Sequence, residues 1–200
     1  MSFNSTEGEI EKKYDIKSKE GNWLKLEEGE NKVRLVSDCS DFGSHFDTQL
    51  KKSFICTGKE TCAYCQKGEK SRVRFYAWVI DRRDGVIKLA EFGYSIFKEI
   101  EKLAKSTDYG FDVTPSYDID INRKGKGLDT EYSILADRKD SPLSEEEEKK
   151  IQDSCKPLDD MIQKMKDKLV GGTEDVKVED VLKSEPVKEV DEKIVLAPNK

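Results

Sequence analysis

The amino-acid sequence predicts a mainly β fold with helices (α+β), and three observations indicate it. Apolar and polar residues alternate over 72–81, as in a half-buried β-strand. Residues 86–92 form a second β-rich run, and the Arg-Arg-Asp-Gly sequence between the two runs is typical of a hairpin turn. Apolar residues at helical spacing over 95–106 predict a helix. At 200 residues, the chain is long enough for one domain with extensions.

The predicted elements follow one another in an order that specifies an architecture. Val33 and Leu35 share one face of a short first strand, and Lys-Gly-Lys-Gly joins the last two strands. In chain order we expect strands at 31–37, 72–81 and 86–92, a helix at 95–106, and strands at 117–123 and 130–136. Five strands with a helix between the third and fourth is the order of an OB-fold barrel. The sequence therefore predicts a five-stranded OB-fold barrel.

The segments around this barrel differ from it in composition. Residues 1–20 are polar with mixed charge, which predicts a flexible N-terminal arm before a core at 21–140. Residues 141–170 predict a helical segment, which Ser144 can cap and Pro157 interrupts. Residues 171–200 are polar with no apolar period, which predicts an acidic disordered tail.

Charge is distributed unevenly along the chain. Residues 141–200 carry −5 of the net −6, whereas residues 51–90 hold ten Lys/Arg against four Asp/Glu. A basic centre with an acidic tail is typical of a protein that binds a polyanion. The sequence shows no apolar run long enough to cross a bilayer and no hydrophobic signal region, so we expect a cytoplasmic protein with reduced thiols and no membrane partner.

One segment, 45–65, collects the only histidine and three of the five cysteines. The spacing is His45-x10-Cys56-x5-Cys62-x2-Cys65. One imidazole and three thiolates make the closed tetrahedral ligand set of structural zinc, and soft sulfur ligands argue against magnesium or calcium. We therefore expect a Zn²⁺-binding knuckle inserted between the first two barrel strands. Cys39 in place of His45, or cysteines that merely pack in a core, remain alternatives.

The strand at 72–81 carries a second pattern. Val73, Phe75, Ala77 and Val79 share one face, which suits a barrel core, and basic and aromatic side chains share the other. Cations and flat rings on an exposed face suit single-stranded nucleic acid, because they neutralise phosphates and stack on bases. The alternative is that Tyr76 and Trp78 are buried under the C-terminal helices. The predicted nucleic-acid contacts are Lys51, Lys52, Tyr64, Lys67, Lys70, Arg72, Arg74, Tyr76, Trp78, Arg82, Arg83, Lys88 and Phe92.

From about Trp23 to Glu148, the sequence resembles the single-stranded DNA-binding proteins of tailed phages, of the T-even helix-destabilising type. The resemblance rests on the His45, Cys56 and Cys62-Ala-Tyr-Cys65 pattern, on Lys-Gly-Glu-Lys at 67–70 with the following strand, and on Gly-Leu-Asp-Thr at 127–130. It implies an OB-fold, a zinc knuckle, a self-associating arm and an acidic tail that recruits replication and recombination proteins. The arm departs from the family, because its lysines are interspersed with acids rather than clustered.

The resulting hypothesis is a non-catalytic protein that binds and protects single-stranded DNA, with little sequence preference, in replication, recombination and repair. The main alternative is a zinc-stapled module of the replication or transcription machinery that binds protein instead. A nuclease would need Mg²⁺ ligands, for which Asp118, Asp120 and Asp129 are the candidates, but alternating acids on an outward strand face are more often just solvated.

Overall fold

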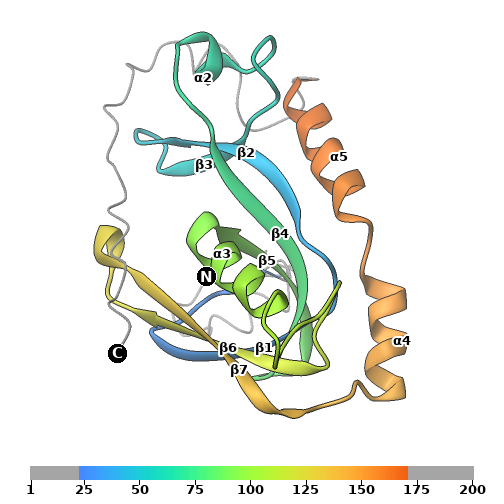
Figure 1. Cartoon of the computed structure of the whole chain (residues 1–200). Coiled ribbons are helices and arrows are strands. Elements are labelled where there is room, and N and C mark those ends of the chain that lie inside the picture. The colour runs from blue at the N-terminus through green and yellow to red at the C-terminus, as the bar shows by residue number, and fades with distance from the viewer. Residues whose placement is uncertain (1–22, 171–200) are drawn as a thin grey trace, which may run out of the picture.

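The computed structural model describes residues 23–170 as an α+β protein, dominated by an antiparallel open sheet of seven strands (Figure 1). The strands are β1 (Gly29–Leu35), β2 (Ser40–Asp47), β3 (Lys52–Ile55), β4 (Arg72–Asp81), β5 (Val86–Gly93), β6 (Tyr117–Lys124) and β7 (Glu131–Asp140). The helices are α2 (Ala63–Gln66), α3 (Tyr94–Ala104), α4 (Glu145–Ser154) and α5 (Leu158–Val170), with a 3-10 turn, η1 (Gly127–Asp129). The predicted arm at 1–20 and tail at 171–200 lie outside the described residues.

The long strand β4 organises the sheet. Its first half pairs with β2 and its last residues pair with β1, while β5 runs along its other edge from Arg74 to Asp81. The strand order is β3-β2-β4-β1-β6-β7, with β5 beside β4. Because β2 leads to β3, one end of the sheet carries the Cys/His segment, and the opposite end carries β6 and β7 (Figure 1).

Two features of the predicted barrel are wrong. A closed barrel would need β5 and β7 to pair, but no such pairing is present among residues 23–170, and α3 packs against both strands instead. The barrel is therefore not closed. The connection that was predicted as an insertion also contains β2 and β3, so the sheet has seven strands rather than five.

The two faces of β4 lie in different apolar clusters. Phe75, Ala77 and Val79 face the main core, where the Phe75 ring stacks on Phe97 of α3 with centroids 3.9 Å apart. Tyr76 and Trp78 face the other way, into a second cluster with residues of α5. Alternation thus places Phe75, Ala77 and Val79 correctly, but Val73, near the start of the strand, is 39% exposed and not part of the core. The C-terminal helices decide what lies on the other face.

The helices α4 and α5 follow β7 and cover this second face (Figure 1). Ser144 caps α4 in a full capping box with Glu147, as its position before an acidic first turn predicts. Leu158 and Ile162 of α5 are buried. No residue of α4 is fully buried, but Ile151 packs against the same cluster, and Arg82 donates to Glu147 at 2.5 Å. None of the helices in the described part of the chain is long and apolar enough to span a membrane.

Candidate metal centre and nucleic-acid interface

Three short elements bring the Cys/His side chains together. His45 comes from β2, Cys56 directly follows β3, and α2 places Cys62 and Cys65 one turn apart. Gly58 and Gly68 both have positive φ angles, which allow the tight turns on either side of α2. The Gly58 carbonyl accepts the N–H of Cys62 at 2.8 Å, so the turn itself fixes the first cysteine of the pair.

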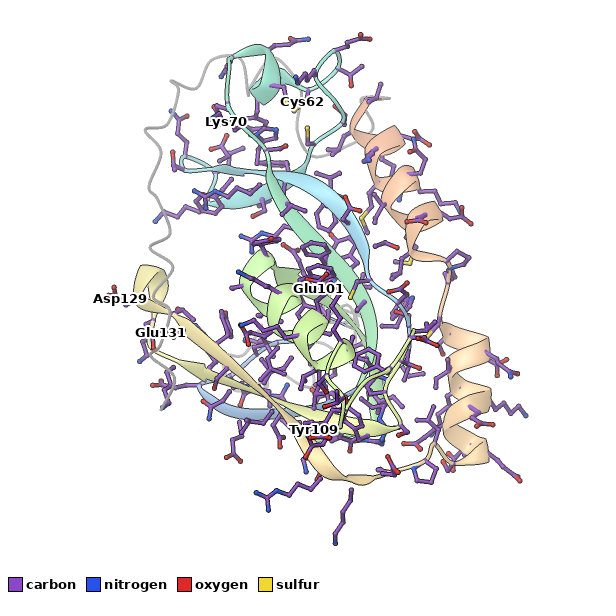
Figure 2. The ribbon with its side chains drawn as sticks, in the orientation of Figure 1. Cys62, Lys70, Glu101, Tyr109, Asp129 and Glu131 are labelled. Carbon is purple, nitrogen blue, oxygen red and sulfur yellow. The ribbon has the colours of Figure 1, made fainter. Side chains whose placement is uncertain are left out.

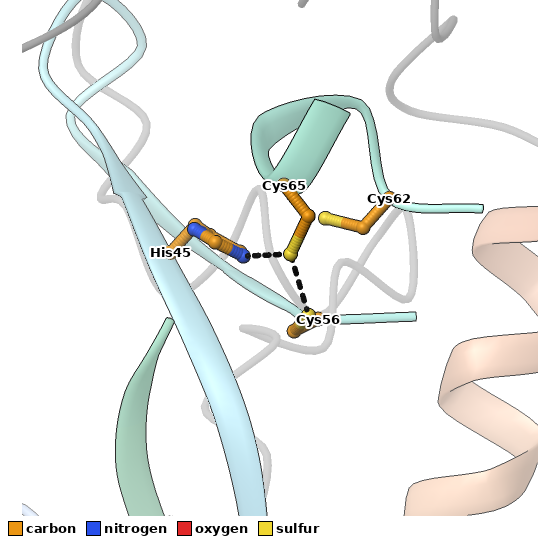
Figure 3. Close-up of side chains that lie close together, drawn as sticks. All are labelled: His45, Cys56, Cys62 and Cys65. Atoms are coloured by element: carbon orange, nitrogen blue, oxygen red, sulfur yellow. Dashed lines mark hydrogen bonds between the residues drawn. The ribbon is translucent and has the colours of Figure 1, made fainter. Parts of the chain in front are cut away.

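The four ligand atoms form a compact group (Figure 3). They all lie within 4.8 Å of one another. The Cys65 Sγ is 3.4 Å from the Cys56 Sγ and 3.4 Å from the His45 Nε2. A tetrahedral zinc ion with ordinary bond lengths would hold such atoms about 3.5–3.8 Å apart. The predicted set of one His and three Cys is therefore close enough together to hold a metal ion.

The surroundings of these side chains fit a cation. Burial lowers the pKa of His45, which keeps the imidazole neutral and its lone pair available. Burial, and then the hydrogen bond with Cys56, raise the pKa of the Cys65 thiol to about 12. Thiolates would therefore be unfavourable here without a positive charge, which a soft divalent ion would supply. Sulfur and imidazole donors suit a soft or borderline divalent ion better than magnesium or calcium.

The other two cysteines lie elsewhere. Cys39 packs beside the main core and Cys155 joins the cluster under α5, and neither belongs to the metal-ligating group among the described residues. Cys39 is therefore not brought to the position of a fourth ligand.

Tyr64 supports the cluster rather than facing solvent. Its ring stacks on His45 with centroids 5.2 Å apart, and its hydroxyl donates to the Asp47 carboxylate at 2.8 Å. The other Asp47 oxygen accepts the N–H groups of Gln49 and Leu50, each at 2.8 Å. Tyr64 was predicted to contact nucleic acid, but only 5% of this residue is exposed, so its ring does not lie open on the surface. This network instead connects the cluster to the turn between β2 and β3.

The exposed aromatic face predicted for β4 is also wrong. Tyr76 and Trp78 are 4% and 9% exposed, and the Trp78 indole N–H donates to the Lys156 carbonyl at 2.9 Å. Phe92 lies in the main core with no exposed surface. The physical reason is that α5 covers the β4 rings and makes their burial favourable, which is the alternative that the sequence left open.

Most of the predicted basic residues at the far end of β4 are held in ion pairs. Arg82 bridges Asp118 and Glu147, Arg83 binds Asp81, and Lys88 binds Asp81 and Asp84. The predicted basic track at this end is therefore largely neutralised by neighbouring carboxylates. At the near end, Arg74 is half-buried with Glu91 at 3.8 Å.

The remaining predicted cations gather around the Cys/His end of the sheet. Lys51, Lys52, Lys70 and Arg72 are exposed there, and Lys67 is half-buried in the turn after α2. Figure 2 shows Lys70 beside the segment of Cys62, far from Asp129 and Glu131 at the opposite hairpin.

Sequence reasoning missed two apolar side chains beside these cations, Phe46 (48% exposed) and Leu50 (46%). Recognising β2 as a strand would have found Phe46. His45 and Asp47 face the metal cluster, so the residue between them must face away.

The acidic residues considered for Mg²⁺ do not converge. Asp118 is nearly buried and binds the guanidinium groups of Arg34 and Arg82 at 2.9 and 3.0 Å. Asp129 lies in η1, at the other end of β6. Among residues 23–170, the Cys/His group is the one cluster of side chains arranged to hold a metal ion.

Fold and site together define an α+β protein with an open antiparallel sheet and a candidate metal centre at one end. A stretch of 67 residues, 32% of this chain, is 39% identical to a protein described as a probable ssDNA-binding protein of Escherichia phage T5. The match spans 24% of that relative, about a quarter of its length. No protein-family model and no solved structure matches the chain. The similarity supports a relation to a single-stranded DNA-binding protein and does not extend to the T-even zinc type.

Proposed function

We propose that this protein binds single-stranded DNA with little sequence preference and holds one structural Zn²⁺. The observation that carries the proposal is the 39% identity to a relative described as a probable ssDNA-binding protein. The exposed cations at the Cys/His end of the sheet support it, because phosphate neutralisation supplies most of the affinity for nucleic acid when sequence is not read. The proposal includes no catalytic step.

Zinc would act by fixing this surface. His45, Cys56, Cys62 and Cys65 would be its ligands. The turn between β2 and β3 connects to the metal cluster through Asp47 and Tyr64, so the ion would hold the Lys51 and Lys52 backbone in place. Lys51 has a positive φ of 51°, a conformation that a non-glycine residue adopts only when its surroundings impose it.

The proposal extends to the biological setting. A protein that covers unwound template would serve DNA replication, recombination and repair in the cytoplasm, that of the host if it is phage-encoded. Residues 173–192 contain eight acidic side chains, and we propose that this segment recruits protein partners. Self-association along DNA through the arm belongs to the same hypothesis.

Fluorescence anisotropy of labelled oligo-dT, compared with a duplex of equal length at several salt concentrations, tests the function. We expect preference for the single strand and a log affinity that falls linearly with log salt, by roughly 0.7 per phosphate contact. Replacing Lys51 or Lys52 with alanine should reduce this slope by less than one unit each. Lys102→Ala, an exposed change on α3, is the matched control. No binding of oligo-dT would refute the proposal and favour a module that binds protein.

A further inference from the structure

A groove lies between the last turns of α5 and the sheet. Its volume is about 320 Å³, near the lower end of ordinary ligand sites. The lining is mostly apolar and includes two aromatic residues, the hydroxyls of Ser53 and Tyr76, and one cation, but no carboxylate: Ser53, Phe54, Ile55, Tyr76, Met165, Lys168 and Leu169. An aromatic wall with a neighbouring cation suits a nucleotide better than a purely apolar ligand.

The groove continues into an open surface on the same face of the sheet. Ser53 of β3 lies opposite Phe46 of β2, and opposite residues of antiparallel strands point to the same side. Arg72 of β4 lies opposite Ser44, two residues before Phe46, so it shares this face too. The edge of the groove therefore carries an exposed ring, Phe46, and an exposed guanidinium, Arg72.

We propose that this groove, with Phe46 and Arg72 at its edge, is the site where nucleotides of a single strand bind. This inference rests on the proposed function and identifies the surface that carries it. A base would stack on the exposed Phe46 ring, its neighbour would enter the groove, and Arg72 and Lys168 would neutralise phosphates. Stacking on a ring accepts every base, which fits binding without sequence preference.

The helix α5 forms one wall of this site and covers the rest of the face. Tyr76 lines the groove. Trp78, two residues further along the same face of β4, is buried, and its indole N–H donates to the Lys156 carbonyl. The site therefore ends where α5 meets the sheet. A bound strand must run from the groove toward the Cys/His end, where the exposed cations lie.

Oligo-dT binding to full-length variants, purified with their metal, tests the site. Phe46→Ala should weaken binding about five- to a hundredfold, as expected when one stacking ring is lost, and Phe46→Tyr should restore it. Arg72→Ala should lower the salt slope by about 0.7. The matched controls are Leu135→Ala and Arg138→Ala, an exposed apolar residue and an exposed arginine of β7, at the opposite end of the sheet.

Photocrosslinking supplies a readout that does not depend on mutants. Oligo-dT with 5-iodouracil should cross-link to peptides containing Phe46. If the wild-type chain binds oligo-dT but Phe46→Ala and Arg72→Ala both match the β7 controls, the groove is refuted and the proposed function stands. If Phe46→Ala fails to fold, Arg72→Ala and the cross-links decide. If the wild-type chain does not bind oligo-dT, both proposals fall together.

Discussion

The Cys/His cluster and the layer between β4 and α5 are both well-packed regions, yet different forces hold them together. The first contains only a small apolar cluster, and its four polar ligands come from residues 45–65. The second buries rings and aliphatic side chains that lie far apart in the chain, including Trp78 and Ile162. A small region with little apolar area would gain stability from a bound ion, whereas a large one gains it from apolar area removed from water.

The largest expected effect is that of metal removal. Chelation, or Cys62→Ser, should unfold the Cys/His segment, because structural zinc contributes about 10–16 kcal/mol of apparent binding free energy in small zinc domains. Elemental analysis of the purified protein should give one zinc per chain. Hydrogen exchange should lose protection at 43–68 and keep more of it in β4. Cys155→Ser, outside the cluster, is the matched control, and equal zinc content in both variants would contradict the assigned ligands.

Truncation of the Trp78 ring should affect the other region. Trp78→Ala should cost about 3–5 kcal/mol of unfolding free energy, because it leaves a cavity under α5 and removes the indole donor to Lys156. Urea denaturation measures this loss, and zinc content should stay unchanged. Trp23→Ala, at a ring that is 42% exposed, should cost less. A Trp78→Ala protein of normal stability that loses only DNA affinity would show that this face is a binding surface after all.

The ion pair between Arg82 and Glu147, at the edge of the β4–α5 layer, should contribute least to the free energy of unfolding. Glu147→Gln weakens the ion pair with Arg82 and the capping box of α4, and should cost about 0.5–1 kcal/mol. The hydrogen bond from the Ser144 backbone, with further help from Arg82, lowers the pKa of Glu147 despite burial. Its contribution is therefore present above the unfolded pKa of about 4.3 and is lost as pH falls below it. Glu146→Gln, its exposed neighbour, should change stability and its pH dependence less.

Corrections to the sequence prediction cluster where distant elements meet. The order of the predicted strands led us to expect a closed barrel. The two strands that would have closed it, β5 and β7, pack against α3 instead of pairing with each other. Arg82 and Lys88 were predicted to bind phosphates, but Asp118, Glu147, Asp81 and Asp84 surround them. Propensity and alternation describe single segments, so they cannot show that Asp118 and Glu147 reach Arg82 from 36 and 65 residues away. The partners of Lys88 lie 7 and 4 residues away on its own hairpin, so the register of that hairpin could have shown them.

The sequence by itself determined the metal-ligating group and the core face of β4. Ligand spacing at 45–65 is a local property, and alternation assigns Phe75, Ala77 and Val79 to one side whatever packs there. Only the tertiary structure decided the opposite side, because the fate of Tyr76 and Trp78 depends on whether α5 docks on them. Tertiary structure also placed Phe46 and Arg72 on one open surface, because β2 pairs with β4 in a register that sets Ser44 opposite Arg72. No local sequence pattern specifies this register.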